Sequence, residues 1–263
     1  MSSIKIILST SHLSIGYQSK KERNTIAENL NLTFEEGKLI SLVGGNGIGK
    51  STLLRTLTGI QKPLSGTVTL NEKDIHHYEP LALAQNLSLV LTEKLPPSNL
   101  TVFELIALGR QPYTNWLGKL SHGDLEKINE AIALTHIAHL LNKKHHEISD
   151  GQLQIVLIAR ALAQDTPLII LDEPTTHLDL FHKLSVFKLL KKLSQETNKC
   201  ILFSTHDIDL AIQLSDEMIV MTEISVEQDN PCSLISKGIF DSLFKDESLF
   251  FDKEKGKFSF RNL

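Results

Sequence analysis

Short apolar runs alternate with amphipathic stretches through most of the chain. The strongest runs are residues 38–43, 167–171 and 200–204, and each has the length of a strand rather than of a typical helix. Because a strand that is apolar along its length has no solvent-facing side, these runs predict strands buried on both faces. Further strands are expected at residues 13–17, 32–34, 66–70, 87–91 and 218–221.

Apolar residues at helical spacing lie between these runs. They predict helices at residues 50–58, 101–109, 124–141, 151–164, 180–196 and 207–214. Thr101 and Glu104 have the spacing of a capping box at the start of one of them. Alternating strands and helices predict an α/β fold with a mainly parallel sheet. The tail at 246–263 is expected to dock on the surface.

The composition is that of an ordinary soluble globular protein. The 263 residues are 41% hydrophobic and 22% charged, and the net charge of −4 carries no basic excess that would indicate nucleic acid. The apolar runs fall short of the roughly 20 residues of a membrane helix, and residues 1–13 do not resemble a secretory signal. Two cysteines without a CxxC spacing do not predict a disulfide framework. We therefore expect a cytoplasmic protein.

Glycines cluster where the first strong apolar run ends. Residues 44–51 read Gly-Gly-Asn-Gly-Ile-Gly-Lys-Ser and satisfy the pattern GxxxxGK[ST]. Glycine lets backbone N–H groups wrap around phosphates, and the following helix adds its positive end. Lys50 can then reach the β- and γ-phosphates, and Ser51 can coordinate Mg²⁺. The predicted nucleotide-binding residues of this loop are Gly44, Gly45, Asn46, Gly47, Ile48, Gly49, Lys50, Ser51 and Thr52.

Two carboxylates follow the apolar run at 167–171. Asp172 and Glu173 fall at the carboxyl end of that predicted strand, where parallel α/β sheets bind their ligands. Asp172 can hold Mg²⁺, and Glu173 can orient or deprotonate a water for attack on a γ-phosphate. Together with the glycine-rich loop, this pair predicts hydrolysis of a nucleoside triphosphate.

Further motifs resemble those of the ATP-binding-cassette ATPases, in family order, over most of residues 13–221. Residues 148–152, Ile-Ser-Asp-Gly-Gln, resemble the signature motif Leu-Ser-Gly-Gly-Gln. Residues 172–179, Asp-Glu-Pro-Thr-Thr-His-Leu-Asp, resemble the acidic motif joined to the D-loop, and residues 204–206, Ser-Thr-His, resemble the switch-histidine loop. Tyr17 lies where the family has an aromatic residue that stacks on adenine.

The resemblance implies the fold of a P-loop ATPase of this type. A RecA-like core is expected at about 1–92 and 165–225, together with an antiparallel β subdomain. A helical subdomain that carries the signature motif is expected at 93–164, and a C-terminal extension at 226–263.

The resemblance also implies roles for individual residues and a homodimer. One ATP would bind to the loop and Tyr17 of one subunit, and the other copy would close over it with the signature residues Ser149, Gly151 and Gln152. Glu173 and His206 would be catalytic, with His206 contacting the γ-phosphate. Asp179 would link the two sites across the dimer.

Two positions depart from the family pattern. Asp150 replaces the first glycine of the signature and brings a carboxylate near the incoming γ-phosphate, where like charges repel. We expect activity with altered dimer closure. The family places a glutamine that contacts Mg²⁺ where Thr92 stands, and the adjacent Glu93 is an alternative substitute. Thr92 is ranked first as the metal ligand, and the choice stays open.

Residues 100–113, Leu-Thr-Val-Phe-Glu-Leu-Ile-Ala-Leu-Gly-Arg-Gln-Pro-Tyr, resemble ATPase subunits of bacterial importers for iron–siderophore complexes, haem and vitamin B12. This likeness implies a separate polytopic permease, an extracytoplasmic substrate-binding protein and a peripheral place on the cytoplasmic face of the membrane. A ferric chelate is the first expectation for the cargo, with haem and cobalamin as alternatives. A soluble cassette acting on ribosomes or DNA, and a slowly hydrolysing regulatory subunit, are the competing interpretations.

Overall fold

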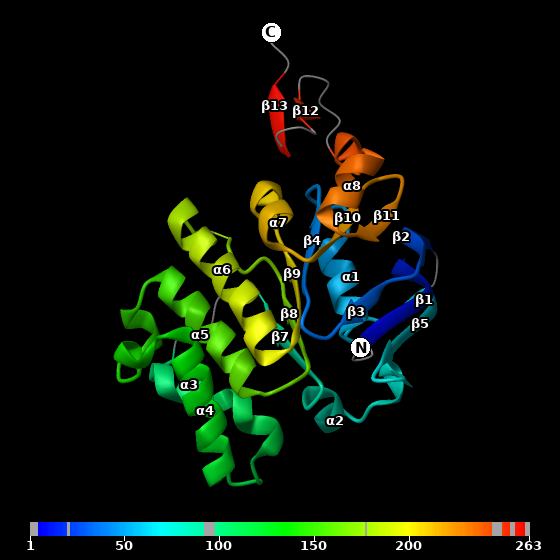
Figure 1. The fold of residues 1–263 in the computed structure, drawn as a ribbon. Coiled ribbons are helices and arrows are strands. Elements are labelled where there is room, and N and C mark those ends of the chain that lie inside the picture. Colours follow the sequence, from blue (N-terminus) through cyan, green and yellow to red (C-terminus); the bar gives the residue numbers. More distant parts are fainter. Residues whose placement is uncertain are drawn as a thin grey trace.

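A mainly parallel sheet forms the centre of the molecule (Figure 1). The computed structural model describes residues 5–19, 22–91, 98–176, 178–243, 249–252 and 256–260. Within them, the strand order of this sheet is β11 (Val226–Asp229), β10 (Glu217–Met221), β4 (Leu39–Gly44), β9 (Cys200–Ser204), β8 (Leu168–Leu171) and β7 (Leu87–Val90). All neighbours are parallel except β10 and β11. The α/β prediction is therefore confirmed, because the three strongest apolar runs form β4, β8 and β9.

An antiparallel sheet made mainly by the first 74 residues lies beside it (Figure 1). Its strands are β2 (Arg23–Leu30), β1 (Ile6–Gln18), β5 (Ser65–Leu70) and β6 (Lys73–Asp74), and β3 (Thr33–Glu35) also pairs with β1. β1 is much longer than the predicted strand at 13–17, and its register with β5 shifts around His12, whose φ is 46°. β2 was not predicted, since most of its residues are polar or partly exposed.

Helices pack against the parallel sheet and also form a group of their own. α1 (Lys50–Leu57), α6 (Leu180–Thr197) and α7 (Ile208–Leu214) follow strands of the sheet. The separate group, drawn in green in Figure 1, contains α3 (Val102–Ala107), η2 (Leu108–Tyr113), α4 (His122–Thr135), η3 (Ala138–Leu140), η4 (His145–Glu147) and α5 (Asp150–Ala163). The shorter elements are η1 (Ile75–His77), α2 (Pro80–Ala84), α8 (Pro231–Lys237) and η5 (Ile239–Ser242).

One predicted helix was too long. The expected helix at 124–141 begins two residues earlier and ends at Thr135, because His136 adopts a left-handed conformation with φ 58°. The Thr135 hydroxyl donates back to the carbonyl of Ala131 at 2.7 Å, and η3 follows as a separate short turn. In the part of the chain that the structure describes, no helix has the length and apolarity needed to span a bilayer.

The central strands send alternate side chains to opposite faces of the sheet. In β4, Leu39 and Val43 belong to one apolar cluster, which includes side chains of α5, α6 and α7. Ile40 and Leu42 belong to a second cluster, which includes side chains of α1 and β1. All four are fully buried. Burial on both faces explains why β4 is apolar almost throughout.

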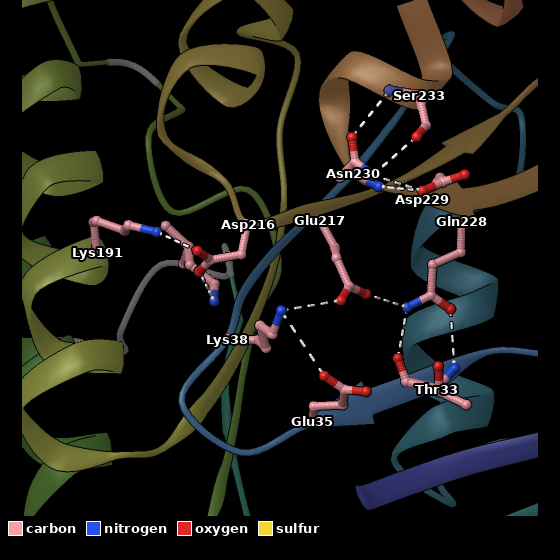
Figure 2. Close-up of polar contacts among 11 residues, drawn as sticks. Thr33, Glu35, Lys38, Lys191, Asp216, Glu217, Gln228, Asp229, Asn230 and Ser233 are labelled. Carbon is pink, nitrogen blue, oxygen red and sulfur yellow. Dashed lines mark hydrogen bonds and ion pairs between the residues drawn. The ribbon is translucent and has the colours of Figure 1, made fainter. Parts of the chain in front are cut away.

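Side-chain hydrogen bonds join the two sheets at their β3 and β11 edges, as Figure 2 shows. The Gln228 side chain accepts from the backbone N–H of Thr33 at 2.9 Å and donates to its carbonyl at 2.5 Å, as a neighbouring strand would. The same amide donates to Glu217 at 3.0 Å. Nearby, the Asp216 carboxylate accepts from the backbone of Leu39 and from Lys191. The Gln228 bonds link β11 to β3 of the antiparallel sheet, while the Asp216 bonds link the start of β10 to β4 and α6.

The described part of the tail forms a hairpin of β12 (Leu249–Asp252) and β13 (Lys257–Phe260). Phe251 is buried, and its ring stacks on Phe240 with centroids 4.8 Å apart. Phe258 meets Phe251 edge-on at 5.1 Å. The hairpin therefore docks on the body of the molecule, as expected for the tail.

Candidate functional site

The glycine-rich loop lies at the carboxyl end of β4 and leads directly into α1. Gly49 precedes the helix with φ 112°, and a Cβ on it would fall 2.3 Å from Cγ2 of Ile26. Both the backbone conformation and the close approach therefore require glycine. The neighbouring Gly47 also has positive φ, at 73°. The loop thus has the tight turn that an anion-binding P-loop needs.

Lys50 folds back over this loop. Its ammonium donates to the carbonyls of Gly44 at 2.9 Å and Gly45 at 3.1 Å, and only 6% of the residue is exposed. Burial lowers the pKa of Lys50, while the nearby carboxylates of Glu173 and Asp172 act in the opposite direction. The structure therefore places the cation in the centre of the loop and within electrostatic reach of the acidic pair.

The two carboxylates follow β8 and are fixed by a serine at the end of β9. Ser204, which is fully buried, donates to Asp172 Oδ1 at 2.7 Å and accepts from the backbone N–H of Glu173 at 2.7 Å. Glu173 has a φ of 47°, a left-handed conformation that is uncommon outside glycine. Beyond its place in the motif at 204–206, no role was predicted for Ser204, although it is a hydroxyl at the carboxyl end of an apolar strand.

His206 approaches Glu173 directly. Its Nε2 lies 2.6 Å from Glu173 Oε1, and Thr176 donates to the other oxygen, Oε2, at 3.0 Å. The residue after the histidine, Asp207, pairs with Lys183 of α6 at 2.9 Å and anchors the loop. The predicted catalytic pair is therefore together, at the same sheet edge as Lys50.

Ser51 is exposed on the first turn of α1, so its hydroxyl is accessible beside the loop. Thr52 is buried and lies 2.9 Å from the Tyr17 hydroxyl, and the Tyr17 residue is 51% exposed. The predicted adenine-stacking residue is thus tied to the helix that follows the loop. Thr92 and Glu93, the two alternatives for a further metal ligand, lie outside the described residues.

The signature residues lie at the start of α5. Ser149 caps this helix, and its backbone and hydroxyl exchange hydrogen bonds with Gln152 at 3.1 and 3.3 Å. Gly151 lies against the ring of His182, in the first turn of α6, and Asp179 caps that helix. Among the hydrogen bonds described for this single chain, none joins Ser149, Gly151 or Gln152 to the glycine-rich loop.

Polar contacts hold the helical group together and link it to α2. Arg110 of η2 is buried, donates to Asp124 Oδ1 at 2.8 Å and to the carbonyl of Ala163 at 2.8 Å, and stacks on Tyr113. The carbonyl of Pro112 accepts from Gln85, at the end of α2. The predicted Arg-x-Pro-Tyr segment therefore joins α4 to α5 through Arg110 and contacts the end of α2 through Pro112.

Comparison with known proteins agrees with this geometry. Residues 27–176 match the family described as ABC transporter. The chain is similar to the achromobactin transport ATP-binding protein CbrD of Dickeya dadantii, with 37% identity over 90% of this chain and 87% of the relative. It is 39% identical to the iron(3+)-hydroxamate import ATP-binding protein FhuC of Bacillus subtilis, over 83% of this chain and 80% of the relative.

A solved structure shares the fold. The dimeric cassette MJ0796, from a bacterial ABC transporter, superposes with a TM-score of 0.72 at 27% identity, covering 86% of this chain and 99% of the cassette. The family match spans more than half of the chain and includes the glycine-rich loop, the signature residues and the acidic pair. The chain therefore belongs to the ABC transporter family and is one of its ATP-binding subunits, which are ATPases.

Proposed function

We propose that this chain is the ATP-hydrolysing subunit of an importer for a ferric chelate. The names of the relatives support this cargo class, since CbrD is an achromobactin transport protein and FhuC an iron(3+)-hydroxamate import protein. Haem and cobalamin remain alternative cargoes. Transport proceeds through a separate polytopic permease, which an extracytoplasmic substrate-binding protein loads. The ATPase subunit acts peripherally at the cytoplasmic face of that membrane, without binding nucleic acid.

The observation that carries the ATPase mechanism is the Glu173–His206 contact of 2.6 Å beside Lys50. The loop amides and the Lys50 ammonium bind the β- and γ-phosphates of ATP. Glu173 accepts a proton from a water molecule as the water oxygen bonds to the γ-phosphorus. The bond between the γ-phosphorus and the β–γ bridging oxygen breaks, and ADP and inorganic phosphate are released. His206 orients Glu173 and contacts the γ-phosphate.

Mg²⁺ fits the oxygen donors at this edge. Ser51 supplies a hydroxyl, and Asp172 supplies a carboxylate that Ser204 holds in one orientation. Mg²⁺ prefers such oxygen ligands and is usually bound by one or two side chains together with phosphates and waters. When bound, the ion would neutralise charge that develops on the phosphates. Thr92 is proposed as a third side chain that would coordinate the Mg²⁺ ion.

The complete site requires a second copy of the chain. Tyr17, Lys50 and the loop bind ATP from one side, and Ser149, Gly151 and Gln152 of the other subunit cover the γ-phosphate. The separation of these two sets within one chain supports this arrangement, as does the dimer formed by the related cassette MJ0796. A symmetric dimer of this kind contains two equivalent sites.

We also propose the division of the chain into the parts that the family resemblance implies. The nucleotide core comprises about 1–92 and 165–225, the helical part 93–164 and the extension 226–263. The permease would dock on the helical part, where Leu108 is 46% and Tyr113 37% exposed. Since Arg110 ties this segment to Ala163 of the signature helix, a movement of the permease would reach the signature residues.

The test compares the purified wild-type protein with the variant Glu173→Gln. Glutamine keeps the shape of the side chain but cannot take the proton, so turnover should fall about 100-fold or more while ATP binding persists. Glu196→Gln, on the exposed end of α6, is the matched control and should keep wild-type turnover. Equal turnover in wild type and Glu173→Gln would contradict the motor mechanism and favour a slowly hydrolysing regulatory subunit.

The partner is tested with the same variant, which should trap ATP in a closed dimer. Tagged Glu173→Gln protein is recovered from detergent-solubilised membranes in the presence of ATP, and the proteins that accompany it are identified. A polytopic permease supports the importer, and transport of radiolabelled ferric chelate into proteoliposomes then identifies the cargo. Recovery of ribosomal proteins without a permease would refute the importer in favour of a soluble cassette.

A further inference from the structure

His182 forms a bridge between two motifs within one chain. It lies in the first turn of α6, where its backbone N–H donates to Asp179 Oδ1 at 2.9 Å. Its ring Nδ1 lies 2.8 Å from the same oxygen, and because a carboxylate oxygen accepts, the ring donates through Nδ1–H. Asp179 therefore accepts two hydrogen bonds from one residue, and these bonds hold the pKa of Asp179 below its ordinary range.

The other edge of the His182 ring faces the signature helix. A Cβ placed on Gly151 would lie 3.1 Å from His182 Cδ2, which is closer than most Cβ contacts in proteins, and 3.5 Å from its Cγ, which is an ordinary contact. The ring therefore lies close to the Gly151 backbone and leaves little room for a side chain at that position. Phe181 meets the His182 ring edge-on, with centroids 5.8 Å apart. One side of the ring thus fixes Asp179, while another lies against the start of α5.

The surface next to this bridge is apolar and exposed in the single chain. Leu180 is 72% and Phe181 74% exposed, which is unusual for two successive large apolar residues. They adjoin Asp179 and lie one and two residues before the His182 bridge. This apolar surface adjoins Asp179, which the proposed dimer places between its two sites.

We propose that His182 is a positioning residue that fixes Asp179 to the signature helix, so that the two motifs meet the second copy of the chain as one rigid edge. The inference rests on the proposed ATP-dependent dimer. Without the His182 ring, Asp179 and Gly151 would move independently. Formation of the closed dimer would then have to fix the position of each residue separately. The loop around Lys50 does not contact His182 through any hydrogen bond described, so ATP binding to the open subunit should not change.

The experiment uses the full chain with His182→Ala, His182→Asn and His182→Leu. Asparagine keeps a donor for Asp179, and leucine keeps a side chain against Gly151 without a donor. Each substitution is also combined with Glu173→Gln to measure ATP-driven dimerisation by analytical ultracentrifugation. Binding of a fluorescent ATP analogue is measured at concentrations where the protein is monomeric. His122→Ala is the matched control, because His122 also lies in a first helical turn beside a carboxylate, that of Glu126, and is almost fully exposed.

For His182→Ala we expect unchanged nucleotide affinity in the monomer, and dimerisation and kcat reduced roughly tenfold, the effect of losing one hydrogen bond to a charged group. His182→Asn should recover most of this loss and His182→Leu little of it. The proposal is overturned if His182→Ala, or His182→Leu where the alanine variant does not fold, dimerises and turns over like His122→Ala. If the wild type neither dimerises with ATP nor hydrolyses it, the proposed function itself has failed instead.

Discussion

Replacing Arg110 with Met should loosen the packing of α4 against α5. Arg110 is 7% exposed and its partner Asp124 is 4% exposed, so neither charge is well solvated. The Arg110 Nε donates to Asp124 Oδ1 at 2.8 Å, and its Nη1 donates to the carbonyl of Ala163 at 2.8 Å. Methionine fills much of the same space but removes both bonds.

The expected loss of unfolding free energy depends on how well the remaining Asp124 carboxylate is stabilised. Removing one partner of a buried ion pair typically costs about 3–5 kcal/mol of unfolding free energy. Asp124 would keep hydrogen bonds from the Ser121 backbone and hydroxyl, at 2.8 and 2.6 Å, and these lower its pKa. Because these donors still stabilise the carboxylate, we expect the lower end of that range, about 3 kcal/mol.

The assay is urea unfolding at pH 7, followed by circular dichroism. Lys192→Met is the control, because the Lys192–Glu196 pair at 3.8 Å is exposed and should contribute less than about 1 kcal/mol. The lowered pKa of Asp124 also predicts a pH dependence. Its carboxylate stabilises the fold at neutral pH, and this contribution is lost as the pH falls through the lowered pKa, so the penalty in Arg110→Met should shrink in acid. A loss no larger than that of Lys192→Met would refute the reasoning.

Two further predictions concern polar contacts elsewhere. Gln228→Glu removes the donor to the Thr33 carbonyl and sets a second carboxylate beside Glu217, so unfolding free energy should fall by about 1–2 kcal/mol relative to wild type, and less at pH 4. Thermal unfolding at both pH values measures it, and an unchanged melting temperature would contradict the role drawn in Figure 2. Asp150→Gly removes a carboxylate from the predicted path of the γ-phosphate and should strengthen ATP-driven dimerisation severalfold. Unaltered dimerisation, ATP affinity and turnover in Asp150→Gly would contradict this effect of Asp150.

The sequence predicted every strand that is buried on both faces, but it missed two exposed edge strands. β4, β8 and β9 are continuous apolar runs, because the two sides of the sheet are covered. β2 and β11 are edge strands with polar or partly exposed residues, and nothing in their composition separates them from loops. Pairing with a neighbouring strand, rather than local pattern, determines such edges.

The candidate site shows the same division between local and tertiary information. The glycine-rich loop and the acidic pair are continuous in sequence, so their chemistry could be predicted from spacing alone. The approach of His206 to Glu173 depends on β8 and β9 being neighbours, and it was expected only through the family resemblance. Ser204 was missed, because its two partners belong to the adjacent strand end and no local pattern indicates them.

Ser204 therefore provides the sharpest test of how the acidic pair is held. Glu173 has an unfavourable left-handed backbone, and its N–H finds its acceptor in the Ser204 hydroxyl. In Ser204→Ala that N–H loses its acceptor and Asp172 loses its donor, at a cost of about 1–3 kcal/mol for an unsatisfied buried group.

If loss of these hydrogen bonds displaces Glu173, turnover should drop roughly tenfold or more, while ATP affinity changes little. Ser194→Ala is the matched control, since Ser194 is equally buried but its hydroxyl donates only to the carbonyl of Lys191 within α6. Steady-state turnover and ATP binding are measured for both variants. Equal turnover would mean that the backbone after β8 holds Glu173 without the serine, and that the left-handed conformation is maintained by the packing of the strand end alone.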